Sequence, residues 1–224
     1  MHGTIASDPA GKLALGYDAY RLAQMVDEGY LAVYSRCREG SGSTLESLGK
    51  AGSGTLHDNY EWRTREDGRH YLHGGYAAFT YHDSMAIADS QGRRYYQSGG
   101  LIFRLDTVAE QNLMRRDNWF TLKIDSAGKP ALDFYSGSGW KTITGKEALE
   151  PGKWYHLSFV IAGNGMAIRL DGNEIARLTG FNPRTSPTSD LFVGCYGDWT
   201  DFYLIGSSVR VHVRGVIVRH CGRG

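Results

Sequence analysis

Alternating apolar and polar residues dominate the second half of the chain, and the clearest case is residues 154–175, WYHLSFVIAGNGMAIRLDGNEI. Within this stretch, residues 166–171 alternate with the period of two that places side chains on opposite faces of a β-strand. Asn164-Gly165 precedes this run and Asp171-Gly172 follows it, and both pairs tolerate the positive φ that tight hairpin turns require. The stretch therefore predicts three antiparallel strands.

The first of these strands, residues 154–161, is expected to lie in the middle of a sheet. Leu157 and Phe159 fall on one face and Val160 on the other, which indicates a strand that is buried on both sides. Trp154, at the start of the strand, is then interpreted as a core anchor and not as a ligand contact.

The rest of the pattern predicts a two-sheet sandwich preceded by one helix. Residues 18–28, DAYRLAQMVDE, carry apolar residues at helical spacing, with Asp18 as a cap and Gly29 as a stop. Residues 38–56 read as a Gly/Ser-rich loop. Further strands are predicted at 30–35, 76–81, 100–105, 118–124, 131–135, 174–178, 190–195, 209–213 and 215–219. We therefore expect an N-terminal arm with a short helix at 1–28 and one β-domain at 29–224.

The end of the chain combines strand alternation with positive charge. Valines alternate with basic residues up to Gly215, which is interpreted as a β-bulge. The outward positions form a basic stripe that consists of Arg210, His212, Arg214, Arg219 and Arg223. This stripe could bind an anionic polysaccharide, or it could be an ordinary solvated outer face of the sheet.

Composition narrows the class of protein. Thirty glycines and fourteen tyrosines against five prolines among 224 residues describe a turn-rich, aromatic β-protein. The formal net charge of +1 gives no global field, which argues against duplex nucleic acid as a partner. No apolar run reaches membrane-spanning length, and the first residues carry no signal-peptide core. The chain as given is therefore expected to be soluble, without membrane insertion, and its compartment stays undecided.

The cysteines carry no recognisable framework. Cys37, Cys195 and Cys221 are odd in number and show no Cys-x-x-Cys spacing. This argues against both a disulfide scaffold and a zinc site, although one pair could still bridge.

Four segments, taken in order, carry a family resemblance. They are GYLAVYSRCREGSGSTLES with AGSGTLHDNYEW, then RHYLHGGYAAFTYHDSMAI, then FTLKIDSAGKPALDFYSGSGWKTITGKEALEPGKWYHLSFVIAGNGMAIRLDGNEI, and finally DLFVGCYGDW. Their order and spacing over about residues 29–220 resemble the laminin G-like, concanavalin A-like jelly-roll family. The expected fold is accordingly all-β: a two-sheet antiparallel jelly-roll sandwich with one short N-terminal helix.

The chain also departs from that family. Its last strand, RVHVRGVIVRH, is basic where family members carry an acidic residue. The resemblance implies Ca²⁺ at a rim site, and Ca²⁺ takes about six to eight oxygen ligands. The nearest carboxylates here, Asp198 and Asp201 with Asp58 and Glu39, form no readable ligand loop. Ca²⁺ therefore stays open, with ordinary turn and capping carboxylates as the alternative.

Jelly rolls also include polysaccharide lyases and glycoside hydrolases, so catalysis must be sought in the residues. A retaining hydrolase needs two carboxylates about 5 Å apart, and the chain has no E-x-D-x-x-E strand pattern to supply them. His73, Tyr81 and His82 could supply a lyase with its acid and base, or could be hydrogen-bonded wall residues. We expect a non-catalytic protein and keep a lyase or hydrolase as the alternative.

A glycan-binding surface requires exposed aromatic rings beside polar side chains, usually on loops. The segment GCYGDWTDFY offers the richest set, namely Tyr196, Asp198, Trp199, Asp201 and Tyr203. Trp140, at a loop tip in SGSGWK, and the pair Tyr95 and Tyr96 are further candidates. The alternative for each is an aromatic lid packed over the edge of the sandwich.

These features together predict a recognition or adhesion module whose partner is a glycan or a protein surface. The module could belong to an oligomer or a larger assembly, such as a virion surface or tail protein, with residues 18–28 as a docking arm. A virion or extracellular surface is the location that this reading favours.

Overall fold

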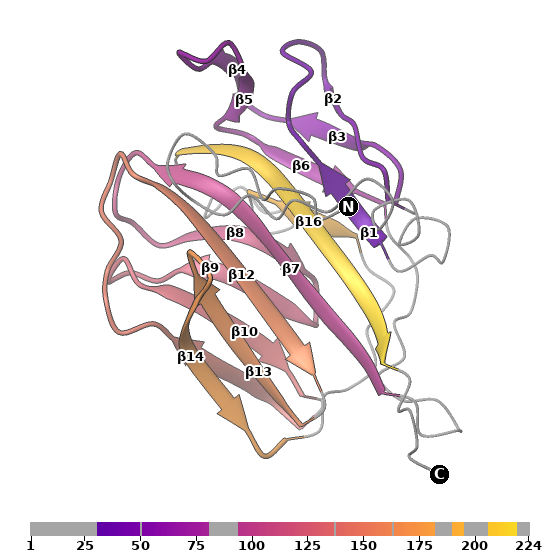
Figure 1. Cartoon of the computed structure of the whole chain (residues 1–224), viewed down its shortest axis with the longest axis vertical. Coiled ribbons are helices and arrows are strands. Elements are labelled where there is room, and N and C mark those ends of the chain that lie inside the picture. Colours follow the sequence, from indigo (N-terminus) through magenta and orange to yellow (C-terminus); the bar gives the residue numbers. More distant parts are fainter. Residues whose placement is uncertain are drawn as a thin grey trace, which may run out of the picture.

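The computed structural model describes residues 31–49, 51–80, 94–136, 138–162, 164–181, 190–194 and 206–218. Every regular element in this part of the chain is a β-strand, and all pairings between strands are antiparallel (Figure 1). The all-β class and the two-sheet sandwich are thus confirmed. The predicted helix at 18–28 lies outside the described residues, and the division into an arm at 1–28 and a domain at 29–224 stays a prediction.

Two sheets of eight strands each form the sandwich (Figure 1). The front sheet, which faces the viewer in Figure 1, contains in spatial order β14 (Asn173–Thr179), β13 (Gly165–Leu170), β12 (Trp154–Ala162), β7 (Arg94–Leu105), β16 (Gly206–Val218), β5 (His70–His73) and β4 (Glu61–Thr64), with β1 (Leu31–Ser35) also paired to β16. The back sheet contains β11 (Trp140–Thr144), β10 (Pro130–Tyr135), β9 (Phe120–Ile124), β8 (Gln111–Arg116), β15 (Leu191–Val193), β6 (Tyr76–Phe79), β3 (Gly54–His57) and β2 (Thr44–Leu45).

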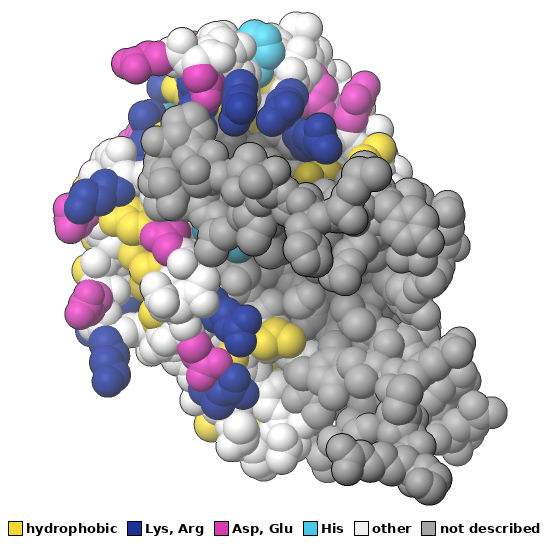
Figure 2. All heavy atoms as spheres, in the orientation of Figure 1, with side chains coloured by type: hydrophobic (Ala, Val, Ile, Leu, Met, Phe, Trp, Pro, Cys, Tyr) yellow, Lys and Arg dark blue, Asp and Glu magenta, His cyan; other side chains and the backbone are white. Residues whose placement is uncertain are grey.

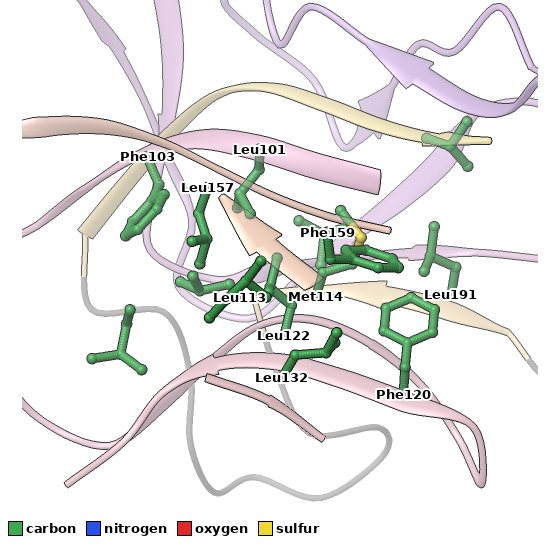
Figure 3. Close-up of a cluster of buried hydrophobic side chains, with 14 of the residues drawn as sticks. Leu101, Phe103, Leu113, Met114, Phe120, Leu122, Leu132, Leu157, Phe159 and Leu191 are labelled. Atoms are coloured by element: carbon green, nitrogen blue, oxygen red, sulfur yellow. The ribbon is translucent and has the colours of Figure 1, made fainter. Parts of the chain in front are cut away.

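The core lies between the inner faces of the two sheets, where side chains of both point toward one another (Figure 3). The front sheet contributes Leu101, Phe103, Leu157 and Phe159, and the back sheet contributes Leu113, Met114, Phe120, Leu122, Leu132 and Leu191. The rings of Phe120 and Phe159 meet across the interface with their centroids 4.7 Å apart. Because burying one large apolar side chain stabilises a fold by about 1.5–3 kcal/mol, this layer is the main source of stability.

The ribbon β12–β13–β14 confirms the three antiparallel strands expected from the sequence. Leu170 pairs with Asn173 across a two-residue turn in which Asp171 and Gly172 have φ of 50° and 88°. Positive φ at both positions is the conformation of the tight hairpin turn that Asp-Gly favours. The Asp171 carboxylate also accepts a hydrogen bond of 2.8 Å from the backbone N–H of His156, which ties the turn to β12.

Two sequence interpretations are wrong. Trp154 is only half-buried and lies on the outer face of the front sheet, because inward positions of β12 follow the parity of Leu157 and Phe159. Gly215 is no bulge: it pairs with Gln97 in unbroken register within one long strand, and the irregularity falls between Ser208 and Arg210.

Several strands escaped the sequence pattern, namely β2, β3, β4, β5, β8 and β11. In β8 the physical reason is a register shift between Asn112 and Met114, since an extra residue interrupts the alternation that marks a strand. Trp140, expected at a loop tip, is instead the first residue of β11 and pairs with Tyr135.

Candidate functional site

The outer face of the back sheet carries polar side chains where β8, β9, β10 and β11 lie side by side. In β9 the residues Phe120, Leu122 and Ile124 are buried in the core, so the alternating residues Thr121 and Lys123 are on the outer face. The register carries the polar row across the sheet, since Thr121 pairs with Arg115 on one side and with Asp133 on the other. Strand alternation and register together therefore create a polar surface that no single strand contains.

These side chains surround a hollow of about 300 Å³. Its lining consists of Glu110, Asn112, Arg115, Thr121, Lys123, Asp133 and Trp140, and we call it the Trp140 hollow. Asn112 and Thr121 are each only 4% exposed and lie deepest. Ligand pockets in proteins span about 300–1,000 Å³, so the hollow is at the small end of that range.

A charged pair occupies the middle of the hollow. The Lys123 ammonium lies 2.9 Å from Asp133 Oδ2 and 3.7 Å from Glu110 Oε1. Burial alone would lower the pKa of Lys123, but the hydrogen bond and charge of Asp133, with help from Glu110, outweigh burial and hold that pKa above its usual value. Asp133 Oδ1 also accepts a hydrogen bond of 2.7 Å from the Thr142 hydroxyl. Lys123 is therefore charged at neutral pH and held in position beside Asp133.

An exposed aromatic ring forms one wall. Trp140 is 50% exposed, and its ring lies against that of Tyr135 with centroids 5.5 Å apart and planes inclined by 59°. The turn before Trp140 is closed by Ser136, whose backbone N–H donates to the Gly139 carbonyl at 3.0 Å. Because β11 is the edge strand of its sheet, this ring is open to solvent beside the charged pair.

The hollow combines the chemistry that a sugar requires. An aromatic face packs against the apolar C–H face of a sugar ring, while its hydroxyls need both donors and acceptors. Lys123 donates, Asp133 accepts, and Asn112 and Thr121 can do both. Sequence reasoning named Trp140 but missed the polar residues, which alternate with core residues in FTLKI and PALDFY and come together only through the sheet register.

The other residues predicted for the site are not tested. Tyr196, Asp198, Trp199, Asp201 and Tyr203 lie outside the described residues, between β15 in the back sheet and β16 in the front sheet. The backbones of Tyr95 and Tyr96 lie in β7, paired with Ile217 and Val216, and their side chains are not among those described.

The residues proposed for a lyase are placed only in part. His73 Nε2 lies 3.6 Å from Asp106 Oδ2, and burial followed by the charge of Arg63 lowers the pKa of His73 below its usual value. Tyr81 and His82 lie outside the described residues. His73 is on the outer face of the front sheet, so it does not belong to the Trp140 hollow.

The carboxylates considered for calcium do not cluster among the described residues. Among them, no group of three or more His, Cys, Asp or Glu side chains could hold a metal ion. Glu39 instead accepts a hydrogen bond of 2.6 Å from the backbone N–H of Glu46, and Asp58 sits in a turn with φ of 61°. Asp198 and Asp201 lie outside the described part.

The described part of the chain contains no helix that is long and apolar enough to cross a membrane.

Comparison with known proteins identifies one family. The model of the concanavalin A-like lectin/glucanases superfamily matches residues 88–212, more than half of the chain. Sex hormone-binding globulin of the rabbit, Oryctolagus cuniculus, is 27% identical over 105 residues, which cover 45% of this chain and 25% of that protein. The chain therefore spans about a quarter of the length of this relative.

Similar folds occur in solved structures. Domain 4 of AbnA, an extracellular arabinanase from Geobacillus stearothermophilus in complex with arabinotriose, superposes with a TM-score of 0.61 at 15% identity, covering 84% of this chain and 94% of the domain. A sialidase from Trypanosoma rangeli in complex with sialic acid gives 0.60 at 15% identity over 96% of this chain and 34% of the enzyme. The binding domain of a botulinum neurotoxin of serotype D/C gives 0.58 at 9% identity, over 84% and 49%. Likeness at these identities shows the shared fold alone.

Proposed function

The chain belongs to the concanavalin A-like lectin/glucanase superfamily, and on that premise we propose that it is a recognition module that binds a glycan without cleaving it. The observation that carries the proposal is the Trp140 hollow, in which the exposed Trp140 ring lies beside the Lys123–Asp133 ion pair. Such a surface binds a sugar through ring stacking and hydroxyl hydrogen bonds. Both carboxylates of the hollow, Glu110 and Asp133, face the Lys123 ammonium, at 3.7 and 2.9 Å, and form ion pairs with it.

The structural neighbours support the class of ligand. Domain 4 of the arabinanase is in complex with arabinotriose and the sialidase with sialic acid, and cell entry of botulinum neurotoxin type C depends upon interaction with two ganglioside molecules. These ligands share sugar rings and differ in charge, so they motivate a panel of neutral and acidic glycans. Binding measurements on that panel identify the particular glycan.

The proposal has two finer parts that come from the sequence. The segment GCYGDWTDFY, with Trp199 as its central ring, is proposed as a second contact for a glycan or a protein surface. Membership of a larger assembly, such as a virion surface or tail, is proposed as the setting in which an adhesion module of this kind would act.

The test is a pair of tryptophan substitutions measured on the same ligands. The wild-type protein is screened on a glycan array that carries arabinan, sialylated and neutral hexose oligosaccharides, and each hit is measured by calorimetry. Trp140→Ala should weaken binding by about 2 kcal/mol, the scale of an interface hot spot, and leave the melting temperature nearly unchanged because the ring is half exposed. Asp133→Asn should also weaken binding, because it removes the charge that holds Lys123 in place.

Leu48→Ala is the matched control, since Leu48 is an equally exposed apolar residue at 54% and follows β2 at the opposite edge of the back sheet. It should leave binding unchanged. Trp199→Ala, measured in parallel, separates the two candidate contacts. Binding of a neutral glycan that survives Trp140→Ala and Asp133→Asn together would overturn the assignment of the hollow, and a module that binds no glycan on the array would overturn the function itself.

A further inference from the structure

A cluster of arginine and tryptophan side chains lies on the outer face of the front sheet, on the opposite side of the sandwich from the Trp140 hollow. Trp154 in β12 pairs in register with Arg104 in β7, and the Arg104 guanidinium carbon is 5.6 Å from the centroid of the Trp154 ring. The guanidinium carbon of Arg65, which follows β4, is 5.5 Å from the same centroid. The ring of Tyr71 meets Trp154 edge-on at 5.8 Å. We call these four residues the Arg65–Arg104 cluster.

Neither of these guanidinium groups has a hydrogen-bonded carboxylate among the described residues. The closest approaches are 3.7 Å from Arg65 Nε to Asp67 Oδ1 and 3.7 Å from an Arg104 terminal nitrogen to Asp106 Oδ1. Both distances exceed the usual range of an N–H···O hydrogen bond, which ends at about 3.2 Å. Arg104 Nε, in addition, is buried and has no acceptor in the described part of the chain. A buried donor without an acceptor is costly, so the fold alone does not satisfy the Arg104 guanidinium.

The cation–π contacts of the two arginines with Trp154 suit one chemical class of ligand. A guanidinium over an aromatic face keeps its N–H groups directed outward in its own plane, in the forked arrangement that matches a carboxylate, sulfate or phosphate. Arg65 and Arg104 retain 17% and 28% exposure of their side chains, so these groups can be reached from solvent. The packing against Trp154 also restricts both side chains in advance, which reduces the entropy lost on binding.

The surroundings carry charges of both signs in equal number. Four arginines, Arg63, Arg65, Arg69 and Arg104, lie near four carboxylates, Glu61, Glu66, Asp67 and Asp106. Figure 2 shows such side chains of both signs gathered at the end of the molecule where β4 and β5 lie. Strand β16 runs between β7 and β5, and Ser207 in it pairs with both Arg104 and His73.

We propose that the Arg65–Arg104 cluster is a second binding site, for the carboxylate or sulfate group of an acidic saccharide. The saccharide part rests on the proposed glycan-binding function; the oxyanion part rests on the two guanidinium groups alone. The two sites lie on opposite outer faces, so one chain engages a neutral sugar through Trp140 and an acidic one through Arg65 and Arg104. Linked sites of this kind raise the avidity for a polymer that carries both kinds of unit.

The experiment uses the full chain and four probes in calorimetry: a trisaccharide of uronate units, a sulfated trisaccharide, a neutral trisaccharide and an acidic peptide of glutamates. The double variant Arg65→Gln with Arg104→Gln should weaken binding of an acidic trisaccharide at least tenfold and leave neutral binding unchanged. Affinity for the acidic probe should fall as salt rises from 50 to about 500 mM, while neutral binding stays constant, because only the former rests on charge. Comparison of the uronate and sulfated probes identifies which oxyanion is preferred.

Arg177→Gln is the matched control, since Arg177 lies on β14 and pairs with Glu174 away from the cluster. If the double variant loses its cooperative thermal transition, Arg65→Lys keeps the charge without the fork and should still weaken acidic binding severalfold. Acidic binding that is unaffected by these variants, or equal affinity for neutral and acidic probes, would overturn the proposal. Equal or tighter binding of the glutamate peptide would overturn the saccharide as the ligand. Trp140→Ala should remove neutral binding only, so the two sites fail or succeed independently.

Discussion

Trp154 is held by charged and aromatic side chains and not by the apolar core. Its ring is contacted by the guanidinium groups of Arg65 and Arg104 and by the edge of Tyr71. Cation–π contacts at partly exposed positions contribute about 0.5–2 kcal/mol each. Phe159, on the inner face of the same strand, is 3% exposed and packs against Phe120. At the scale of single residues, Trp154 and Phe159 of β12 therefore stabilise the protein by different means.

A pair of substitutions measures this difference. Trp154→Ala should lower the free energy of unfolding by about 2 kcal/mol, through lost ring contacts at the surface. Phe159→Ala should cost about 3–5 kcal/mol, because it leaves a cavity between the sheets. Urea denaturation monitored by circular dichroism gives both values. A loss for Trp154→Ala as large as that for Phe159→Ala would show that the indole acts as a core residue after all.

The link between β5 and β6 is one of the connections that pass from the front sheet to the back sheet. β5 belongs to the front sheet and β6 to the back sheet, and only Gly74 and Gly75 separate them. Both glycines have positive φ, 66° and 59°. A Cβ atom at Gly75 would lie 2.6 Å from the His57 carbonyl oxygen and 2.7 Å from Tyr60 Cβ. The crossing is therefore possible only with a residue that lacks a side chain.

Gly75→Ala should destabilise the protein by at least about 3 kcal/mol, since backbone strain and steric overlap add. Gly172→Ala is the matched comparison: φ there is 88°, but nothing lies within 4 Å of the added carbon. It should cost only about 1 kcal/mol, the strain of a positive φ alone. Differential scanning calorimetry of both variants separates the cost of the positive φ from the cost of steric overlap. Equal losses of stability in the two variants would show that movement of its neighbours relieves the overlap at Gly75.

At the scale of the whole molecule, the sandwich presents two outer faces with different chemistry. The back sheet carries the Trp140 hollow, and the front sheet carries the Arg65–Arg104 cluster. The described strands begin at Leu31, which pairs with Arg214 near the other end of the described chain. The two sheets thus share one core and are expected to unfold as one unit.

A shortened chain tests this division. A protein of residues 29–224 should unfold in one cooperative transition at nearly the same temperature as the full chain. If residues 18–28 act as a docking arm, light scattering at high concentration should find a larger particle for the full chain and a monomer for the shortened one. A full chain that stays strictly monomeric would count heavily against the assembly, and a shortened chain that fails to fold would show that the first residues belong to the domain.

Much of the fold follows from local patterns in the sequence. The alternation in β12 and β13 and the Asp171-Gly172 turn define a hairpin, because side-chain period and positive φ are properties of a few consecutive residues. The abundance of glycine and aromatic residues likewise indicates an all-β class. Strands with an interrupted alternation, such as β8 with its register shift after Asn112, carry no such local signature.

Only the tertiary structure decided which side chains meet. Alternation defines two faces of each strand but does not say which face turns inward, so Trp154 and Phe159 were equally good core candidates until the second sheet was in place. The Trp140 hollow needs residues from β8, β9, β10 and β11 in one register, and the Arg65–Arg104 cluster needs β4, β5, β16, β7 and β12 in this order in the front sheet. Strand pairing between distant segments brings these groups together, because contacts across a sheet depend on long-range register rather than on neighbouring residues.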